Sequence, residues 1–225
     1  MAGYYAQTLS AERLKMCYDL APPRVDRYLD AEIAFVLKRV QRGSHVLELG
    51  CGYGRVLERL AGESGAEVFG VDTSAESLRL ARERLGDQRH CHVLQMDAID
   101  LAFPDDRFDI VICIQNGISA FGVDRLQLVR EAVRVTKPGG RAVFSSYAAQ
   151  FWPHRLAWFR IQADHGLIGP IDEQATGDGV IVCTDGFRAA TVDRDEFRSL
   201  AARCGVTAII TEVDESSVFC ELPVT

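Results

Sequence analysis

A glycine-rich turn and three carboxylates carry the clearest chemistry in this sequence of 225 residues. Gly50 opens the turn and Gly54 closes it, and such turns let backbone N–H groups approach a ligand closely. Glu48 precedes the turn, while Asp72 and Asp97 each follow a later apolar run. Ligands of an open parallel sheet bind beyond the carboxyl ends of its strands, so we expect these carboxylates to lie together. They suit a ligand with cationic groups, and Asp72 is placed to accept hydrogen bonds from a ribose.

Short apolar runs alternate with helical patterns from residue 44 onward. The runs are apolar on both faces, which is typical of parallel strands covered on both sides. We therefore predict an α/β fold, a Rossmann-like, mostly parallel seven-stranded sheet with helices on both faces. The last two strands are separated by only three residues and must form a C-terminal antiparallel hairpin. The expected strands are 45–49, 67–72, 92–96, 108–114, 141–146, 206–213 and 217–222.

We expect one domain over residues 1–225, because no repeat, low-complexity tract or Gly/Ser linker indicates a second. Helical spacing over 9–18 and 24–40 predicts a helical cap before the first strand. Glycine-rich turns and both tryptophans follow the fifth strand and suggest an inserted lid. The expected parts are an N-terminal helical cap (1–42), a cofactor-binding core (43–150), a lid and acceptor insertion (151–190) and a closing helix and hairpin (191–225).

Composition narrows the class of partner. Twenty-five Lys and Arg face 32 Asp and Glu, a net charge of −7, which argues against nucleic acid and favours a small molecule. No apolar run approaches the roughly 18 residues of a membrane span, and Met1–Ser10 has no signal-peptide pattern, so we expect no membrane association and a cytoplasmic location. Seven cysteines without a Cys-x-x-Cys pair predict reduced thiols and no metal site. The oligomeric state is not indicated.

Several motifs in order resemble class I S-adenosylmethionine-dependent methyltransferases. The likeness covers about residues 40–150, together with the closing helix and hairpin. It implies methyl transfer from S-adenosyl-L-methionine to a small-molecule acceptor by in-line displacement, in which positioning supplies most of the catalysis. The matching segments are 46–55 (the first motif), 70–74 (the ribose-binding acidic segment), 96–98 (the adenine-binding turn), 108–111 (the fourth strand) and 137–141 (the loop before the fifth strand).

The resemblance also implies which residues bind the cofactor. Glu48 would steady the glycine turn, Asp72 would hold the ribose, and Asp97 would accept from the adenine amine. The full implied set is Glu48, Gly50, Cys51, Gly52, Gly54, Asp72, Thr73, Asp97, Ala98, Ile114 and Gln115.

The acceptor side is less well marked. Asn116 is followed by Gly117, where relatives that methylate base or glutamine amino groups have Asn/Asp-Pro-Pro-aromatic, so those substrates are disfavoured. His154 follows a proline near an expected helix start and is our candidate for a general base. Aromatic residues nearby fit a lid, although their spacing also fits plain core packing. The expected acceptor pocket is Tyr18, Asn116, Tyr147, Phe151 and Trp152.

Three alternatives stay open. An NAD(P)-dependent oxidoreductase is disfavoured because the nicotinamide fingerprint has its third glycine at the position of Arg55, one after Gly54. A non-catalytic S-adenosylmethionine-binding domain fits the lack of an evident nucleophile. A thiophilic acceptor such as trivalent arsenic would require Cys17, Cys183 and Cys220 to converge.

Overall fold

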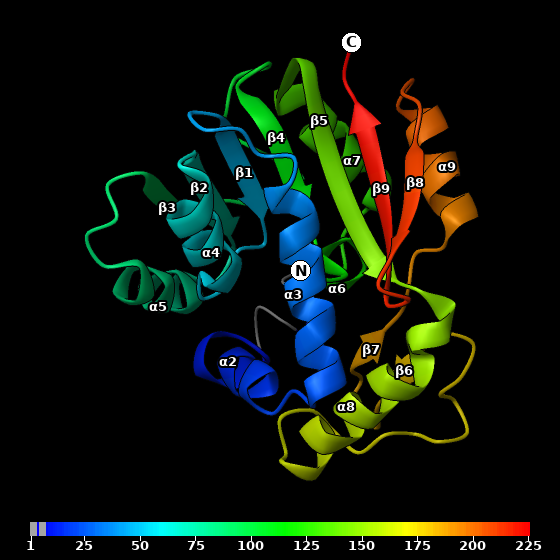
Figure 1. Ribbon diagram of the computed structural model, residues 1–225. Coiled ribbons are helices and arrows are strands. Elements are labelled where there is room, and N and C mark those ends of the chain that lie inside the picture. Colours follow the sequence, from blue (N-terminus) through cyan, green and yellow to red (C-terminus); the bar gives the residue numbers. More distant parts are fainter. Residues whose placement is uncertain (1–3, 5–7) are drawn as a thin grey trace.

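In the part of the chain that the computed structural model describes, Tyr4 and residues 8–225, seven strands form one sheet with helices on both faces (Figure 1). Residues 1–3 and 5–7 of the expected cap lie outside this part. The sheet order is β3-β2-β1-β4-β5-β9-β8, parallel from β3 to β5, with β9 antiparallel to both β5 and β8. The predicted fold class is confirmed. The strands are β1 (His45–Leu49), β2 (Glu67–Asp72), β3 (Cys91–Gln95), β4 (Phe108–Cys113), β5 (Thr136–Tyr147), β8 (Ile209–Val213) and β9 (Ser217–Pro223).

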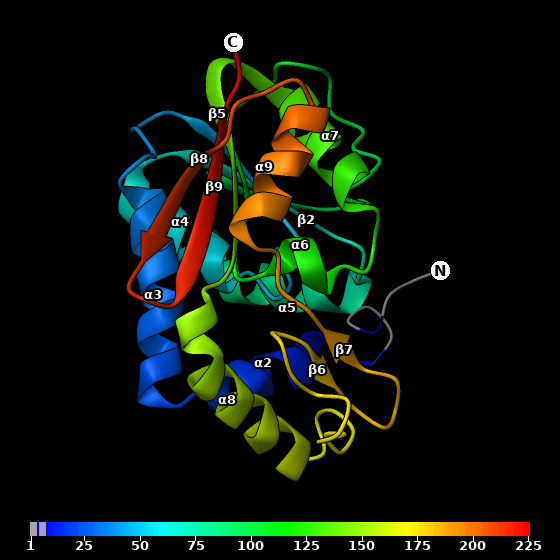
Figure 2. The same ribbon diagram turned by 90° about the vertical axis from the view of Figure 1, so that its right-hand side faces the viewer.

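Alternation along the strands supplies an apolar layer to each face of the sheet. In β1, Val46 belongs to the layer beneath three helices, and its neighbour Leu47 belongs to the opposite layer. Figure 2 shows the two groups of helices on opposite sides. Among the described helices, none has the length and apolar run needed to cross a bilayer. The first group is α3 (Pro23–Leu37), α4 (Arg55–Ser64) and α5 (Ala75–Leu85), and the second is α7 (Arg125–Val135) and α9 (Arg194–Arg203).

A third apolar cluster joins the N-terminal helices to the segment inserted after β5. Trp158 ties the two together, because its Nε1 donates to the carbonyl of Cys17 at 2.9 Å. Figure 1 shows this layer at the end of the sheet to which β5 runs, so it covers the carboxyl ends of the parallel strands. Its elements are α2 (Ala11–Asp19), the start of α3, α8 (Trp152–Asp164) and the antiparallel pair β6 (Ile181–Val182) and β7 (Arg188–Ala189); α6 (Gly117–Ala120) and η1 (Ala149–Phe151) are short turns nearby.

β5 begins earlier than the sequence predicts. We expected residues 137–140 to form a loop before the strand, but Thr136 already pairs with Phe108 of β4. The next pair is Ile110 with Arg141, so the register shifts across the glycine-containing segment. The expected loop is therefore an irregularity within β5 rather than a connection before it.

Candidate cofactor and acceptor site

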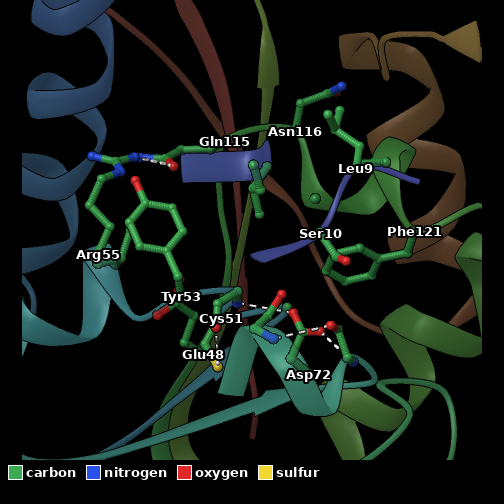
Figure 3. A pocket seen from close by; sticks show the side chains of 18 of the residues that line it. Leu9, Ser10, Glu48, Cys51, Tyr53, Arg55, Asp72, Gln115, Asn116 and Phe121 are labelled. Carbon is green, nitrogen blue, oxygen red and sulfur yellow. Dashed lines mark hydrogen bonds between the residues drawn. The ribbon is translucent and has the colours of Figure 1, made fainter. Parts of the chain in front are cut away.

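A cavity of about 420 Å³ lies where the ends of the parallel strands meet the cap (Figure 3). One wall comes from the turn after β1 and from the ends of β2 and β4, and the opposite wall comes from α2 and α8. The structure thus gathers segments that are far apart in the sequence. The predicted cofactor residues that line the cavity are Glu48, Gly50, Cys51, Gly52, Asp72, Thr73, Asp97, Ala98, Ile114 and Gln115.

Gly54 is the one predicted cofactor residue that does not line the cavity. It is the N-cap of α4 with φ +83°, a left-handed conformation that favours glycine. A Cβ at this position would lie 3.1 Å from the Cβ of Ala81 in α5. The third glycine of the turn therefore allows α4 to start against α5, and it does not contact the cavity.

Gly50 lies beneath the ring of Phe121, a cavity residue that the sequence did not predict. The backbone of Gly50 has φ +74°, and a Cβ there would lie 2.2 Å from Cζ of Phe121. No side chain at position 50 can share this space. The first glycine thus keeps one wall of the cavity as bare backbone.

Asp72 connects the end of β2 to the glycine turn. Its carboxylate accepts from the N–H of Gly52 at 3.0 Å and from the N–H of Ser74 at 2.8 Å, as drawn in Figure 3. Burial raises the pKa of Asp72, although these N–H donors oppose the rise. The carboxylate is therefore held at the cavity wall by the two loops that it joins.

Glu48 is a buried carboxylate in the same wall, with 5% of its surface exposed. Burial raises its pKa to about 8; the guanidinium of Arg55 opposes this rise and Asp72 adds to it. Within the described residues, Oε2 of Glu48 has no hydrogen-bond partner. An unpaired buried acceptor is costly, so a cationic or N–H group of a ligand would satisfy it.

Arg55, Tyr18 and Tyr53 lie together in the cavity wall, where the cavity meets a second, more polar hollow. The guanidinium carbon of Arg55 lies 4.5 Å from the centre of the Tyr18 ring, and the two tyrosine rings are 6.0 Å apart. Arg55 Nη2 also donates to Oε1 of Gln115 at 2.5 Å. Tyr18 is a predicted acceptor residue, whereas Tyr53 and Arg55 were missed despite standing in or beside the glycine turn.

The backbone turns sharply after β4. Gln115 has φ +56° and Asn116 has φ +63°, two successive non-glycine residues in the left-handed region. The side chain of Asn116 accepts from Ser146 Oγ at 2.8 Å and donates to the carbonyl of Ala190 at 3.0 Å. We call Gln115–Asn116 the β4 elbow; bonds from β5 and from the segment after β7 hold it at the cavity wall.

The expected acceptor pocket needs correction. Tyr18, Asn116 and Tyr147 line the cavity, but Phe151 and Trp152 do not. Phe151 is fully buried against the ring of Tyr147, with centroids 6.0 Å apart, and so belongs to the core of the cap. Trp152 packs on the outside of the same cluster.

His154 is also outside the cavity. Its side chain is on the exposed side of α8, and its ring lies 5.7 Å from that of Phe151. The structure therefore does not bring this candidate base to the site. The residues of α8 that do line the cavity come later: Trp158 and Phe159, and Gln162 one helical turn after them.

The contribution of α2 was mostly missed as well. Leu14, Cys17 and Tyr18 line the cavity at helical spacing, together with Leu9 and Ser10 before the helix. This spacing is visible in the sequence, but it marks only an apolar face and not what the face covers.

The three cysteines of the thiophilic alternative do not form one site. Cys17 and Cys183 belong to the cluster of the cap, whereas Cys220 belongs to a layer against the sheet. Among the described residues, no group of three or more His, Cys, Asp or Glu side chains is arranged to hold a metal ion. The structure thus gives no support to an arsenic-binding thiol triad.

Comparison with known proteins agrees with the sequence motifs. Residues 46–140 match a family model described as a methyltransferase domain. The chain is 30% identical to the methyltransferase GfsG of Streptomyces halstedii over 79% of this chain and 58% of that protein. It is 36% identical to the demethylmenaquinone methyltransferase of Listeria welshimeri over 47% of this chain and 45% of the relative. The chain thus spans about half the length of these curated relatives.

Solved structures share the fold at low identity. A SAM-dependent methyltransferase from Methanosarcina mazei has a TM-score of 0.63 at 21% identity, covering 84% of this chain and 97% of that one. The magnesium protoporphyrin IX methyltransferase of Synechocystis PCC 6803, solved with bound SAH, has a TM-score of 0.64 at 18% identity, covering 99% and 97%. With the ordered motifs and the strand order, these matches support a class I S-adenosylmethionine-dependent methyltransferase.

Proposed function

We propose that this protein transfers the methyl group of S-adenosyl-L-methionine to a small-molecule acceptor. One observation carries the proposal: the unpaired, buried carboxylate of Glu48 stands beside a glycine turn in a cavity that also holds Asp72 and Asp97. Such a wall suits an adenosine ligand with cationic groups and repels a pyrophosphate. This favours a sulfonium cofactor over NAD(P).

The residues present fit that cofactor. Gly50 and Gly52 line the cavity without side chains, and Glu48 offers an acceptor for a positively charged group. Asp72 and Asp97 would hold the ribose and the adenine amine, with Ala98 beside the ring. When bound, the cofactor supplies an activated methyl group together with its leaving group.

The acceptor end of the cavity indicates an uncharged molecule with an apolar body. The lining contributed by α2, α8 and β5 carries no Asp, Glu, Lys, Arg or His among the described residues. A charged acceptor buried there would lack a partner. The residues of this end are Leu9, Leu14, Cys17, Tyr18, Tyr147, Trp158, Phe159 and Gln162. The relatives named above include an enzyme of demethylmenaquinone methylation, which agrees with a small apolar acceptor.

The protein's own part in the reaction is positioning and exclusion of water. Holding the acceptor atom about 3–3.5 Å from the methyl carbon, in line with the breaking bond, supplies several kcal/mol. Aromatic side chains of α8 and β5 keep this end dry, which strengthens electrostatic interactions with the sulfonium. We also propose that residues 1–225 form one cytoplasmic domain that acts in this way and does not bind nucleic acid. The acidic net charge supports the proposal that nucleic acid is not a partner.

Calorimetric titration with S-adenosylhomocysteine, in parallel with NAD, tests the proposal. We expect S-adenosylhomocysteine to bind and NAD not to bind; the reverse would favour an oxidoreductase. Transfer of label from methyl-tritiated S-adenosylmethionine into small molecules of a cell extract then separates an enzyme from a binding domain. Binding without transfer in any extract would leave only the binding domain.

A further inference from the structure

A buried carboxylate lies directly behind the β4 elbow. Glu32 belongs to α3, has no exposed surface and does not line the cavity. Its Oε2 accepts from the backbone N–H of Gln115 at 2.6 Å and from Ser145 Oγ at 2.7 Å. These two contacts join α3 to the ends of β4 and β5.

The elbow needs such a support. Each non-glycine residue in the left-handed region costs on the order of 1 kcal/mol or more, and Gln115 and Asn116 are successive. Ser146 and Ala190 fix the side chain of Asn116. The backbone N–H of Gln115 donates to Glu32 and also, at 2.8 Å, to Ser145 Oγ, which is itself bonded to Glu32. Both elbow residues line the cavity, so a shift here moves the wall of the site.

A carboxylate at this position lowers the stability of the fold. Burial raises the pKa of Glu32 to about 7, while the nearby Ser217 hydroxyl, the hydrogen bonds from Ser145 and Gln115 and the charge of Arg55 oppose the rise. Oε1 of Glu32 has no partner among the described residues. A neutral side chain would avoid the cost of burying this group, so its presence points to a role at the site.

We propose that Glu32 is a positioning residue: from the cap it holds the Gln115 amide, and through it the strained β4 elbow, at the reacting end of the cavity. Since the reaction is itself a proposal, this inference rests on the proposed function. The hydrogen bond from the Gln115 amide to Glu32 is strongest when the carboxylate is ionised, because charged acceptors make the stronger hydrogen bonds. The rate therefore rises with pH as Glu32 loses its proton.

The ionisable groups around Glu32 do not obscure this transition. Tyr28 comes from its own helix, Tyr147 from β5, Cys113 from β4 and Arg55 from α4. Burial raises the pKa values of both tyrosines and of the cysteine well above the neutral range. Glu48, whose pKa burial raises to about 8, reaches Gln115 only through Arg55, so a step near pH 7 in the Gln115 amide signal that persists in Glu48→Gln belongs to Glu32.

The first test is the Gln115 amide in the ¹⁵N-labelled protein. Its proton shift should move with a midpoint near pH 7 in the wild type. The step should disappear in Glu32→Gln and persist in Asp30→Asn, a matched change at an exposed position of the same helix. A wild-type signal that does not titrate, or a step that survives Glu32→Gln, would overturn the proposal. This test needs no acceptor and stands even if the wild type transfers no methyl group.

The second test is transfer of labelled methyl groups to a cell extract at saturating cofactor. Glu32→Ala should slow transfer about 100-fold, the effect of a misplaced reacting wall, while the dissociation constant of S-adenosylhomocysteine stays within about threefold. Glu32→Gln, which keeps one acceptor oxygen, should recover most of the rate but lose its rise through pH 7. If a folded Glu32→Ala variant transferred methyl groups at the wild-type rate, a positioning role would be contradicted. If that variant does not fold, an unchanged pH–rate profile in Glu32→Gln contradicts it equally.

Discussion

At the scale of single residues, the candidate site contains a carboxylate, Glu48, that the fold buries at a cost. Glu48 has its pKa raised to about 8, so the folded state binds a proton more tightly than the unfolded chain does. The contribution of Glu48 to the free energy of unfolding should then fall as pH rises from about 4.5 to about 8 and stay constant above that.

Glu48→Gln should remove this loss of stability at high pH. We expect the variant to be more stable than the wild type by about 2 kcal/mol or more at pH 8.5, and nearly equal to it at pH 4. Urea unfolding across this pH range measures the difference. Equal free energies of unfolding of the wild type and the variant at pH 8.5 would show that burial does not raise the pKa of Glu48.

Glu221 provides a control, because its pKa is shifted in the opposite direction. It is also buried, but Arg39 and Arg141 outweigh the effect of burial and lower its pKa. Its ion pairs stabilise the fold above the ordinary pKa of a glutamate and are lost as pH falls. Glu221→Gln should therefore destabilise the protein at neutral pH, where Glu48→Gln stabilises it.

The sequence predicts these residues unevenly. Gly50, Gly52, Asp72 and Asp97 are predictable because their positions follow from the ends of strands, and they do line the cavity. Arg55 and Phe121 are not, because their place in the cavity depends on side-chain direction. His154 was predicted from its position beside a proline, yet the rotation of α8 turns it to solvent.

At the scale of elements, close packing of α4 on β2 depends on a glycine. A Cβ at Gly70 of β2 would lie 2.4 Å from Cδ1 of Leu57 and 2.8 Å from Cβ of Cys51. Gly70→Ala should therefore destabilise the protein by about 1–3 kcal/mol through overpacking. Thermal unfolding with far-ultraviolet circular dichroism measures the change.

Gly62 is the matched control in the same packing unit. It lies inside α4, and a Cβ there would meet nothing within 4 Å. Gly62→Ala should stabilise the protein by roughly 0.5–1 kcal/mol, since alanine is the better helix former. A destabilised Gly62→Ala, or a neutral Gly70→Ala, would contradict the described packing of α4.

Element types follow from the sequence better than element boundaries do. The boundaries of α7 follow local features, because Asp124 caps its start and its apolar spacing ends at Val135. The start of β5 is missed because Thr136 pairs with Phe108 through a long-range contact, whereas the residues that follow Thr136 have the local sequence of a turn. α6 is missed because four residues carry no periodicity.

At the scale of the whole molecule, the parallel sheet is predictable and the closure of the cap is not. Alternating strands and helices dictate the layers, but nothing local in the sequence shows which surface α2 covers. That placement depends on contacts such as the Trp158 bond to Cys17, which spans 141 positions of the chain.

Closure of the cap predicts where a bound ligand protects the backbone. Because α2 supplies cavity residues, S-adenosylhomocysteine should slow amide hydrogen exchange in 11–19 as well as in the turn 50–54. α9, on the far side of the sheet, should exchange no more slowly than global stabilisation requires. Protection of the turn without protection of α2 would show that the cap does not close on the ligand.

The most direct test of the whole account is the affinity of Asp72→Ala for S-adenosylhomocysteine by calorimetry, beside Asp87→Ala at an exposed position after α5. Loss of a carboxylate that accepts charged hydrogen bonds should weaken binding by about 2 kcal/mol, roughly 30-fold, in Asp72→Ala alone. Equal affinity of the wild type and a folded Asp72→Ala variant would mean that the nucleoside binds elsewhere.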